Sequence, residues 1–418
     1  MSKIWAKDNK EMSNTAKFFN SFTTGNDYII DRDNFLYFDL VASKAHALTL
    51  QEAGIYSKED LFKINNLLDM AMITPGLIEV TKEDEDCHTA IEKYLTKLAG
   101  DLGKKIHTGR SRNDQSLTMI RLYMTTKLGQ VMDLDCNLIE TLDNLSKRYK
   151  DQLFIGYSHT QQAMITTLGH YYNAFCEQVS DDWDLLENIK FLIDKSPLGS
   201  GAGFGSPVKL NRKLSAKKMG FRGVQNNSLY CQNSRGKFEL LYVQGLGHVM
   251  ETLQKLATDM ILYTTREFSF FDVSDDLSQG SSMMPQKKNL DVFELIRAKA
   301  AEVISLEARL HLINKGLPSG YNRDLQLVKN AIVEATETTS DCLRAMDLAL
   351  RNITPNDANI RKEIREDIYS ADLATIKCMD NPALNFRDVY KEILNDKTIY
   401  TPEEILKRRV SAGSPGNY

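Results

Sequence analysis

The side chains best suited to chemistry lie in one short segment, residues 280–289, which reads Gly-Ser-Ser-Met-Met-Pro-Gln-Lys-Lys-Asn. It carries two hydroxyl groups, two lysine ammonium groups and an amide, and no apolar period assigns it to a core. Its glycine and proline favour a turn. A lysine-rich solvated turn is one interpretation. The other is an anion-binding loop with a catalytic serine, because clustered lysine and amide donors stabilise a carboxylate-bearing substrate.

Two further segments are dense in hydrogen-bonding side chains, and each stands before a predicted long helix. Residues 104–115 read Lys-Lys-Ile-His-Thr-Gly-Arg-Ser-Arg-Asn-Asp-Gln, and residues 156–162 read Gly-Tyr-Ser-His-Thr-Gln-Gln. Arginine and asparagine at a helix start suit the binding of a carboxylate. The alternatives are a solvated loop for the first segment and a structural hydrogen-bonding role for His159 in the second.

Long helices must position these segments, because apolar residues recur at intervals of three and four along five stretches. The stretches cover residues 128–145, 168–193, 246–261, 292–310 and 325–350, and no proline lies between Pro75 and Pro197. We therefore expect a mainly α-helical chain with a central bundle of five long helices. Residues 79–81 are the best candidate for a short strand. Three regions are expected: a helical N-terminal region (1–108), the bundle (109–353) and a small helical C-terminal region (354–418).

The bulk composition narrows the function classes. The 418 residues carry a net charge of −4, from 52 Lys and Arg against 56 Asp and Glu, which disfavours a nucleic-acid-binding protein. Six cysteines without a C-x-x-C spacing argue against a zinc cluster and a disulfide scaffold. No apolar run has the length of a signal peptide or a membrane span. These features are typical of a cytoplasmic enzyme.

Cofactor motifs are absent from the sequence. The alternating glycines at 199, 201, 203 and 205 do not form G-x-G-x-x-G, and neither a Walker motif nor H-E-x-x-H occurs. We expect no metal and no organic cofactor.

The 280–289 segment resembles the shared motif of the fumarase/aspartase superfamily, Gly-Ser-Ser-x-Met-Pro-x-Lys-x-Asn, at every fixed position. The strings at 107–115 and 156–161 are similar to those of the argininosuccinate lyase family, as are residues 85–92, 196–201, 291–297 and 317–326. This resemblance extends from about residue 30 to residue 393. It implies a β-elimination that converts L-argininosuccinate to L-arginine and fumarate. It also implies a homotetramer with a twenty-helix core and active sites shared among three subunits, without a nucleic-acid or membrane partner.

The resemblance further implies roles for individual residues. Ser281 takes the proton, with Lys287 stabilising its alkoxide, and Asn289 helps Lys287 to stabilise the carbanion. His159 acts at the leaving group with Glu294 as its carboxylate partner. Which of Ser281 and His159 is the acid and which the base stays open. The implied substrate-binding residues are Ser43, Asp86, His88, Arg112, Asn113, Ser158, Gln161, Tyr321, Gln326 and Lys329.

Four departures from the family pattern stand out. Leu290 and Ile165 replace usual prolines, Ser158 replaces a threonine, and Leu327-Val328 replaces Glu-Asp beside the implied arginine site. The last change leaves open a fumarate-releasing lyase with another N-succinyl or amino-acid substrate. A non-catalytic, crystallin-like homologue is the alternative from a different class, and the joint presence of the five implied catalytic residues argues against it.

Overall fold

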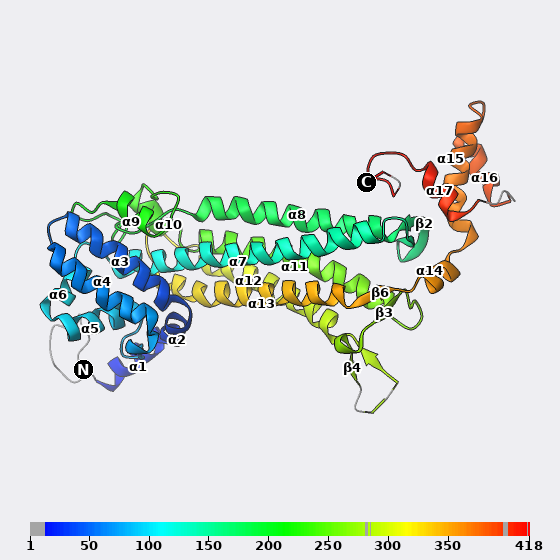
Figure 1. Ribbon diagram of the computed structural model, residues 1–418. Helices are drawn as coiled ribbons and strands as arrows, with labels where there is room; N and C mark the ends of the chain where they lie inside the picture. The colour runs from blue at the N-terminus through cyan, green and yellow to red at the C-terminus, as the bar shows by residue number, and fades with distance from the viewer. Residues whose placement is uncertain (1–12, 281–282, 285, 396–399, 416) are drawn as a thin grey trace. The chain divides into compact units, whose positions relative to one another are not determined.

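The structure is a computed structural model that describes residues 13–280, 283–284, 286–395, 400–415 and 417–418 (Figure 1). The described residues form two compact units. Unit 1 is drawn from Met1–Met132, Leu185–Gly247 and Val303–Thr338, and unit 2 from Asp133–Asp184, His248–Glu302 and Thr339–Tyr418. Each unit combines segments that are separated in the sequence, whereas the three predicted regions are consecutive. The two divisions cannot be compared boundary by boundary, so the boundaries at residues 108 and 353 stay predictions.

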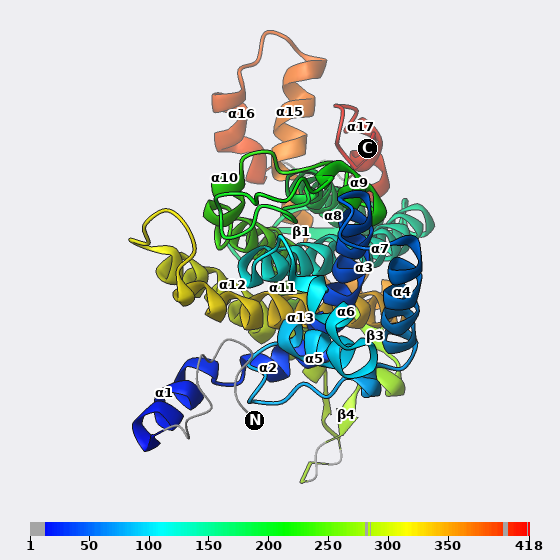
Figure 2. The same cartoon turned by 90° about the vertical axis from the view of Figure 1, so that its left-hand side faces the viewer.

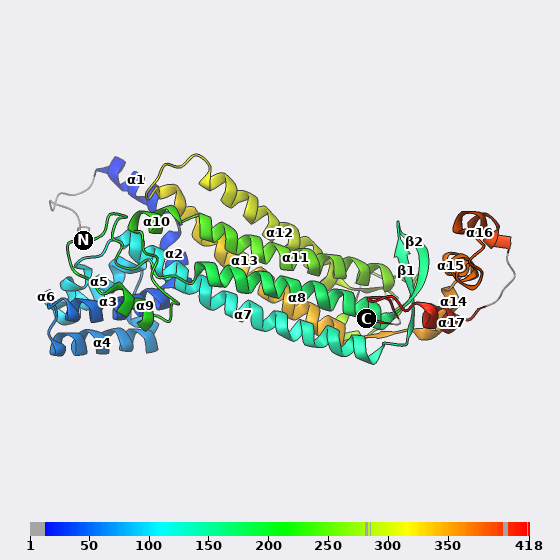
Figure 3. The same cartoon turned by 90° about the horizontal axis from the view of Figure 1, so that it is seen from above.

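Five long helices confirm the prediction of a mainly helical chain. They are α7 (Arg112–Arg148), α8 (Leu168–Ile193), α11 (Lys237–Tyr263), α12 (Asp291–Asn314) and α13 (Val328–Arg351). Within each unit, segments of these helices lie side by side (Figures 1 and 3). Their apolar stripes are buried, as Leu246, Leu253 and Met260 of α11 illustrate. The helical period of three and four could therefore predict them.

Unit 1 adds a layer of shorter helices formed largely by the N-terminal residues (Figure 2). They are α1 (Asn14–Thr24), α2 (Asp27–Ile30), α3 (Leu36–Glu52), α4 (Lys58–Ile73), α5 (Cys87–Ala99), α6 (Asp101–Lys104), α9 (Arg212–Lys218) and α10 (Ser228–Asn233). A π-helical turn (Asp31–Phe35) joins α2 to α3, and short 3-10 helices cover Pro75–Leu77, Lys105–His107 and Arg323–Leu327. α3 packs against α4, α5 and α9.

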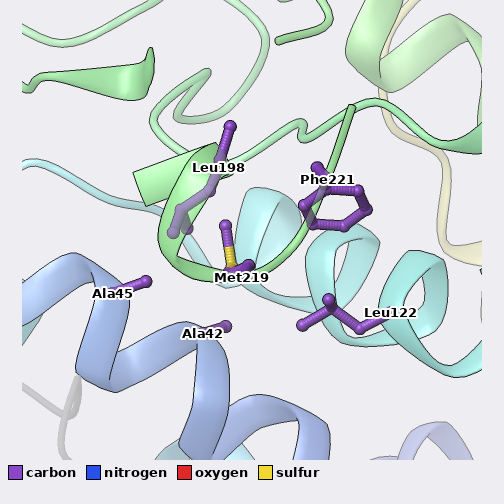
Figure 4. Close-up of a cluster of buried hydrophobic side chains, with 7 residues drawn as sticks. Ala42, Ala45, Leu122, Leu198, Met219 and Phe221 are labelled. Atoms are coloured by element: carbon purple, nitrogen blue, oxygen red, sulfur yellow. The ribbon is translucent and has the colours of Figure 1, made fainter. Parts of the chain in front are cut away.

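A buried apolar cluster fixes the segment between α8 and α11 to the rest of unit 1. Ala42 and Ala45 of α3 and Leu122 of α7 meet side chains of the connecting segment, as Figure 4 shows. The cluster comprises Ala42, Ala45, Leu122, Leu198, Ala216, Met219 and Phe221, all at most 9% exposed. Burial of this apolar surface holds the glycine-rich stretch 199–205 close to the start of α7.

Unit 2 contains the strands and the C-terminal helices. The strands β1 (Leu153–Ser158) and β2 (Gln161–Thr167) form an antiparallel hairpin (Figure 3). β3 (Phe271–Val273) pairs with β6 (Ile353–Pro355), and β4 (Gln279–Gly280) with β5 (Lys288–Asn289). The helices are α14 (Asp357–Glu363), α15 (Ser370–Asp380), α16 (Phe386–Glu392) and α17 (Pro402–Arg408), with 3-10 helices at Asp275–Leu277, Glu366–Tyr369 and Ile393–Asn395.

The strand prediction was wrong. Residues 79–81 form no strand, and the β1–β2 hairpin was not predicted. The hairpin register shifts between Gly156 and Tyr157, so Gly156 pairs with Met164 while Tyr157 pairs with Gln162. This irregularity breaks the alternation of buried and exposed side chains that identifies a strand in a sequence.

None of the helices in the described part of the chain has both the length and the apolar character needed to cross a membrane.

Candidate active site

Capping hydrogen bonds at the start of α7 place Arg112 and Asn113 at the helix N-terminus. The Ser111 hydroxyl accepts the backbone N–H of Asn113 at 3.2 Å, and the Asp114 carboxylate accepts the backbone N–H of Ser111 at 2.8 Å. These reciprocal bonds satisfy donors that the first helical turn leaves without partners. Arg112 and Asn113 are both partly exposed there, so the helix start presents a cation and an amide.

Asp114 also ties this helix start to the glycine-rich stretch. Its Oδ2 atom accepts the backbone N–H groups of Gly199 and Gly201 at 2.9 and 3.0 Å. Burial raises the pKa of Asp114 to about 6 despite these hydrogen bonds. Gly201 has φ 60°, and a Cβ there would lie 2.7 Å from the Gly205 carbonyl oxygen. The glycines therefore allow a backbone turn around a buried carboxylate.

Asp86 connects α5 to Arg112. Its Oδ1 atom accepts the Thr89 backbone N–H at 2.9 Å and so caps α5. Its Oδ2 atom accepts from Arg112 Nε at 2.7 Å and from Arg112 Nη2. Burial alone would raise the pKa of Asp86, but the charges of His88 and Arg112 outweigh burial and hold it below its ordinary value. Asp86 therefore orients Arg112 as well as lining the site.

A cleft of 160 Å³ in unit 1 gathers most of the predicted substrate-binding residues. It is lined by Asp86, His88, Arg112, Asn113, Tyr321, Gln326 and Lys329. These residues come from the N-cap and first turn of α5, from α7, from α13 and from the segment just before α13, so distant parts of the sequence meet here. Five charged residues that line the cleft were not predicted as site residues: Asp27, Asp31, Glu85, Arg235 and Arg323. The spacing of four between Asp27 and Asp31 is a signal for two acids on one helical face, whereas Arg235 belongs to no motif.

The N-terminal segment lies along the residues before and at the start of α13. The Thr23 carbonyl oxygen accepts from Arg323 Nη2 and Gln326 Nε2, both at 3.0 Å. Lys329 Nζ donates to Asp27 and Asp31, both at 2.6 Å. Burial would lower the pKa of Lys329, but Asp31 and Asp27 outweigh it and raise that pKa. Gln326 and Lys329 thus already have partners within the chain.

His88 belongs to a buried polar cluster beneath the cleft. Its Nδ1 atom lies 2.7 Å from Asp39 Oδ2, and the Cys87 thiol donates to the same oxygen at 3.5 Å. Burial would lower the pKa of His88, yet the Asp39 carboxylate raises it overall. Asp39, Cys87 and His88 place potential metal-ligand atoms within 4.8 Å of one another. Burial and the neighbouring carboxylates raise the pKa of Cys87, which disfavours the thiolate that a metal prefers. The expectation of no metal stays a prediction.

Ser43 does not line the cleft. Its side chain is fully buried, and its hydroxyl accepts from Arg110 Nη1 at 3.1 Å. Leu327 is exposed and Val328 is fully buried, and neither lines the cleft. The departure from the family pattern at these two positions therefore involves no side chain that lines the cleft.

His159 stands at the tip of the β1–β2 hairpin in unit 2. Ser158 pairs with Gln161, so His159 and Thr160 form a two-residue turn. Their φ angles are 50° and 57°, the sign pattern of a type I′ turn, which favours asparagine and glycine. A β-branched threonine with positive φ is strained. The strain marks the tip as a candidate functional element, since such conformations cluster at active sites.

Residues at and beside the hairpin turn line two hollows of unit 2. Ser158 and His159 line a groove of 580 Å³, and Gln161 lines a cleft of 820 Å³ against the C-terminal helices. Gln162 Nε2 donates to the Glu363 carbonyl at 2.8 Å and fastens β2 to the end of α14.

The 280–289 segment begins and ends in the β4–β5 ladder. Gly280 pairs with Lys288 and Gln279 with Asn289, while Lys287 is exposed. Ser281, the predicted base, lies outside the described residues, so its predicted role stays untested. Glu294 is exposed in the first turn of α12. Among the described residues no hydrogen bond or ion pair joins Glu294 to His159, and that pairing too stays a prediction.

The sequence of this chain is similar to a known protein family and to individual relatives. The chain matches the family described as "Lyase" over residues 9–305. It is 37% identical over 395 residues to an argininosuccinate lyase of Thermotoga neapolitana, covering 94% of this chain and 97% of the relative. It is 36% identical over 400 residues to that of Xanthomonas campestris, covering 94% and 92%.

Solved structures agree in fold. EDDS lyase in complex with formate matches with a TM-score of 0.78 at 21% identity, covering 94% of this chain and 86% of that one. The class II fumarase of Schistosoma mansoni matches with a TM-score of 0.74 at 15% identity, covering 90% and 87%. With near-complete relatives well above 30% identity and the shared fold, the chain belongs to the argininosuccinate lyase family.

Proposed function

We propose that this protein cleaves L-argininosuccinate to L-arginine and fumarate. The observation that carries the proposal is the similarity of almost the whole chain to argininosuccinate lyases at 34–37% identity. The polar cleft of unit 1, with Arg112 and Asn113 at a helix start, supports it because the substrate is a polar amino acid with several carboxylates. Leu327 and Val328 do not line the cleft, which weakens the reason to favour another amine substrate.

The proposed reaction is a β-elimination. A base takes the proton from the carbon next to one succinyl carboxylate, and the electron pair moves into that carboxylate to give a dianion. The electrons then form the double bond of fumarate as the C–N bond breaks, and an acid protonates the departing guanidino nitrogen. In this proposal Ser281 and His159 act as the acid–base pair. Lys287 and Asn289 stabilise the dianion, and Glu294 orients His159.

We also propose a cytoplasmic homotetramer whose active sites are shared among three subunits. The similarity of almost the whole chain to argininosuccinate lyases supports this proposal, because the family resemblance implies such an assembly.

Fumarate release tests the function directly. Its ultraviolet absorbance is followed with argininosuccinate, adenylosuccinate, aspartate and malate offered separately, and turnover is expected with argininosuccinate alone. Activity only on another compound would support a different fumarate-releasing lyase. No activity on any of the four would contradict the proposal and favour a non-catalytic homologue.

Substitution of the predicted base tests the mechanism. Ser281→Ala is expected to abolish turnover while the assembled state, measured by light scattering, stays unchanged. Ser278→Ala makes the same chemical change three residues earlier, where the hydroxyl donates to the Asp275 carbonyl, and should leave turnover near wild type. His159→Asn should slow the reaction strongly. Near-normal rates in Ser281→Ala or His159→Asn would remove that residue from the acid–base pair.

A further inference from the structure

The β1–β2 hairpin needs contacts outside itself to keep its turn in place. It has two strands, and an isolated two-stranded hairpin is at best marginally stable in water. β1 is held by the ring of Phe154, which packs against the rings of Tyr171, Tyr263 and Phe270 at centroid distances of 5.4, 5.3 and 6.0 Å. β2 has no aromatic side chain, so other contacts must hold it.

Arg409 contacts β2 from the C-terminal segment. It is the residue that ends α17, and its Nη1 atom donates to the carbonyl oxygen of Ile165. Ile165 is fully buried within β2 and pairs with Ile155 of β1. The hydrogen bond from Arg409 therefore acts on the paired part of the hairpin. α17 itself also packs against β2.

Asp372 of α15 fixes the direction of the Arg409 guanidinium. Arg409 Nε donates to Asp372 Oδ1 at 2.9 Å and Nη2 donates to Oδ2 at 2.6 Å. The Arg409 and Asp372 side chains are 15% and 11% exposed. Two parallel bonds to one carboxylate leave a planar guanidinium little freedom to rotate. The remaining nitrogen, Nη1, is therefore held in place for the Ile165 carbonyl.

A second contact joins the C-terminal segment to β2. His170 Nε2 lies 3.0 Å from the Gly413 carbonyl oxygen, and His170 Nδ1 lies 3.0 Å from the hydroxyl oxygen of Thr166. The imidazole thus connects the segment after Arg409 to the residue next to Ile165. Arg409 also lines the 580 Å³ groove that His159 lines. The C-terminal segment is therefore part of the surroundings of the hairpin turn.

The place of His159 depends on the two strands, because a two-residue turn continues directly from both of them. We propose that Arg409 is a positioning residue for His159. It holds β2 through the Ile165 carbonyl, and β2 in turn holds the hairpin turn. This inference rests on the proposed function in taking His159 as a member of the acid–base pair. In this role Arg409 acts through β2 and not on the substrate.

Kinetics and hydrogen exchange on the full-chain protein test this role together. Arg409→Gln keeps a polar side chain but removes the charge and the two parallel bonds. The kcat for argininosuccinate should fall about 10- to 100-fold while KM changes little, since a shift of about 1 Å in a catalytic group slows the chemical step. Amide exchange should become faster over residues 153–167 and stay unchanged in the β3–β6 pair.

The neighbouring Arg408 provides the matched control. Its side chain is 48% exposed and lies 3.9 Å from Asp380, so Arg408→Gln removes the same charge at the surface of α17. Turnover and exchange should stay at the wild-type level. Arg409→Lys keeps the charge without the planar fork and should give an intermediate rate. Adding Asp372→Asn to Arg409→Gln should cost no further activity, because the two side chains act as one unit.

The positioning role is overturned if Arg409→Gln has the same kcat as Arg408→Gln, or if its hairpin exchanges no faster than that of wild type. A lower thermal midpoint with a normal kcat would also overturn it, because Arg409 would then only stabilise the fold. Should Arg409→Gln fail to fold, Arg409→Lys is compared with Arg408→Lys, and equal kcat values would overturn the role.

The wild-type protein separates this inference from the proposed function. Turnover of argininosuccinate by wild type and equally by Arg409→Gln would overturn the positioning role and leave the proposed function intact. An absence of turnover in wild type would contradict the proposed function. The exchange comparison would then decide alone whether Arg409 holds the hairpin.

Discussion

Asp86 serves two partners at once, because one oxygen caps α5 while the other holds Arg112. Asp86→Ala should lower the free energy of unfolding by about 1 kcal/mol for the cap and about 1 kcal/mol for the partly exposed charged hydrogen bonds. Asp86→Ser keeps a capping oxygen and should recover about half of that loss. Urea unfolding measures both variants. Equal losses for alanine and serine would contradict the capping role.

Asp135 of α7 gives stability an unusual pH dependence. It is fully buried, and neither carboxylate oxygen has a partner among the described residues. Burial and the nearby Asp182 carboxyl, which accepts from Thr252 at 2.6 Å, raise the pKa of Asp135 to about 8. An unfolded aspartate titrates near ~3.9. The folded state therefore holds this proton more tightly, and the stabilisation present below about pH 4 is lost as pH rises to about 8.

Asp135→Asn should remove this dependence, because the amide has a similar shape and does not titrate. The thermal midpoint of wild type should fall more between about pH 5 and 8 than that of the variant. Asp133→Asn changes an exposed aspartate on the same helix and should leave the wild-type profile intact. Parallel profiles for wild type and Asp135→Asn would show that the carboxyl finds a partner in the assembled protein.

The sequence predicts the positions of some site residues and not of others. Arg112 and Asn113 could be placed at a helix start because the polar run ends where the apolar period begins. Asp27 and Arg235 could not be associated, since about two hundred residues separate them and neither belongs to a recognisable motif. Only the packing of the N-terminal segment and of residues 228–240 around α7 and α13 brings both into one cleft.

At the scale of elements, helices were predictable and the hairpin was not. The five long helices repeat one apolar period over many turns, so the signal accumulates. The β1–β2 hairpin has short strands, a register shift and a turn without asparagine or glycine, which removes each usual strand and turn signal. The family resemblance identified His159 as a site residue, but it did not indicate that His159 lies in a strained hairpin turn.

Thr160→Gly tests that strain. Glycine adopts positive φ without a Cβ clash, so the variant should gain about 1 kcal/mol of stability, measured as a higher thermal midpoint. Thr166→Gly in β2, opposite Phe154, has no positive φ to relieve and should lose stability. A loss in both variants would mean that the tip of the hairpin is not strained.

At the scale of the whole molecule, the predicted site residues are divided between two units that each draw on distant parts of the chain. A sequence shows which residues match a family, but it cannot show which of them share a cleft in one subunit. The cleft of unit 1 contains Gln326, whereas His159 belongs to unit 2. If active sites are shared among subunits, an assembly that mixes two inactive variants should recover activity. If each site lies within one subunit, it should not.

Gln326→Ala and His159→Asn should each be nearly inactive alone and regain activity when assembled together. In a one-to-one mixture every subunit carries one defect, so a site built within one subunit could never be intact. A site that takes Gln326 from one subunit and His159 from another would have both intact in about a quarter of cases. Co-expression with two affinity tags isolates the mixed assemblies, and fumarate release measures them. Activity no higher than that of either variant alone would contradict the shared site, because random assembly of the two chains must produce such pairs if the residues come from different subunits.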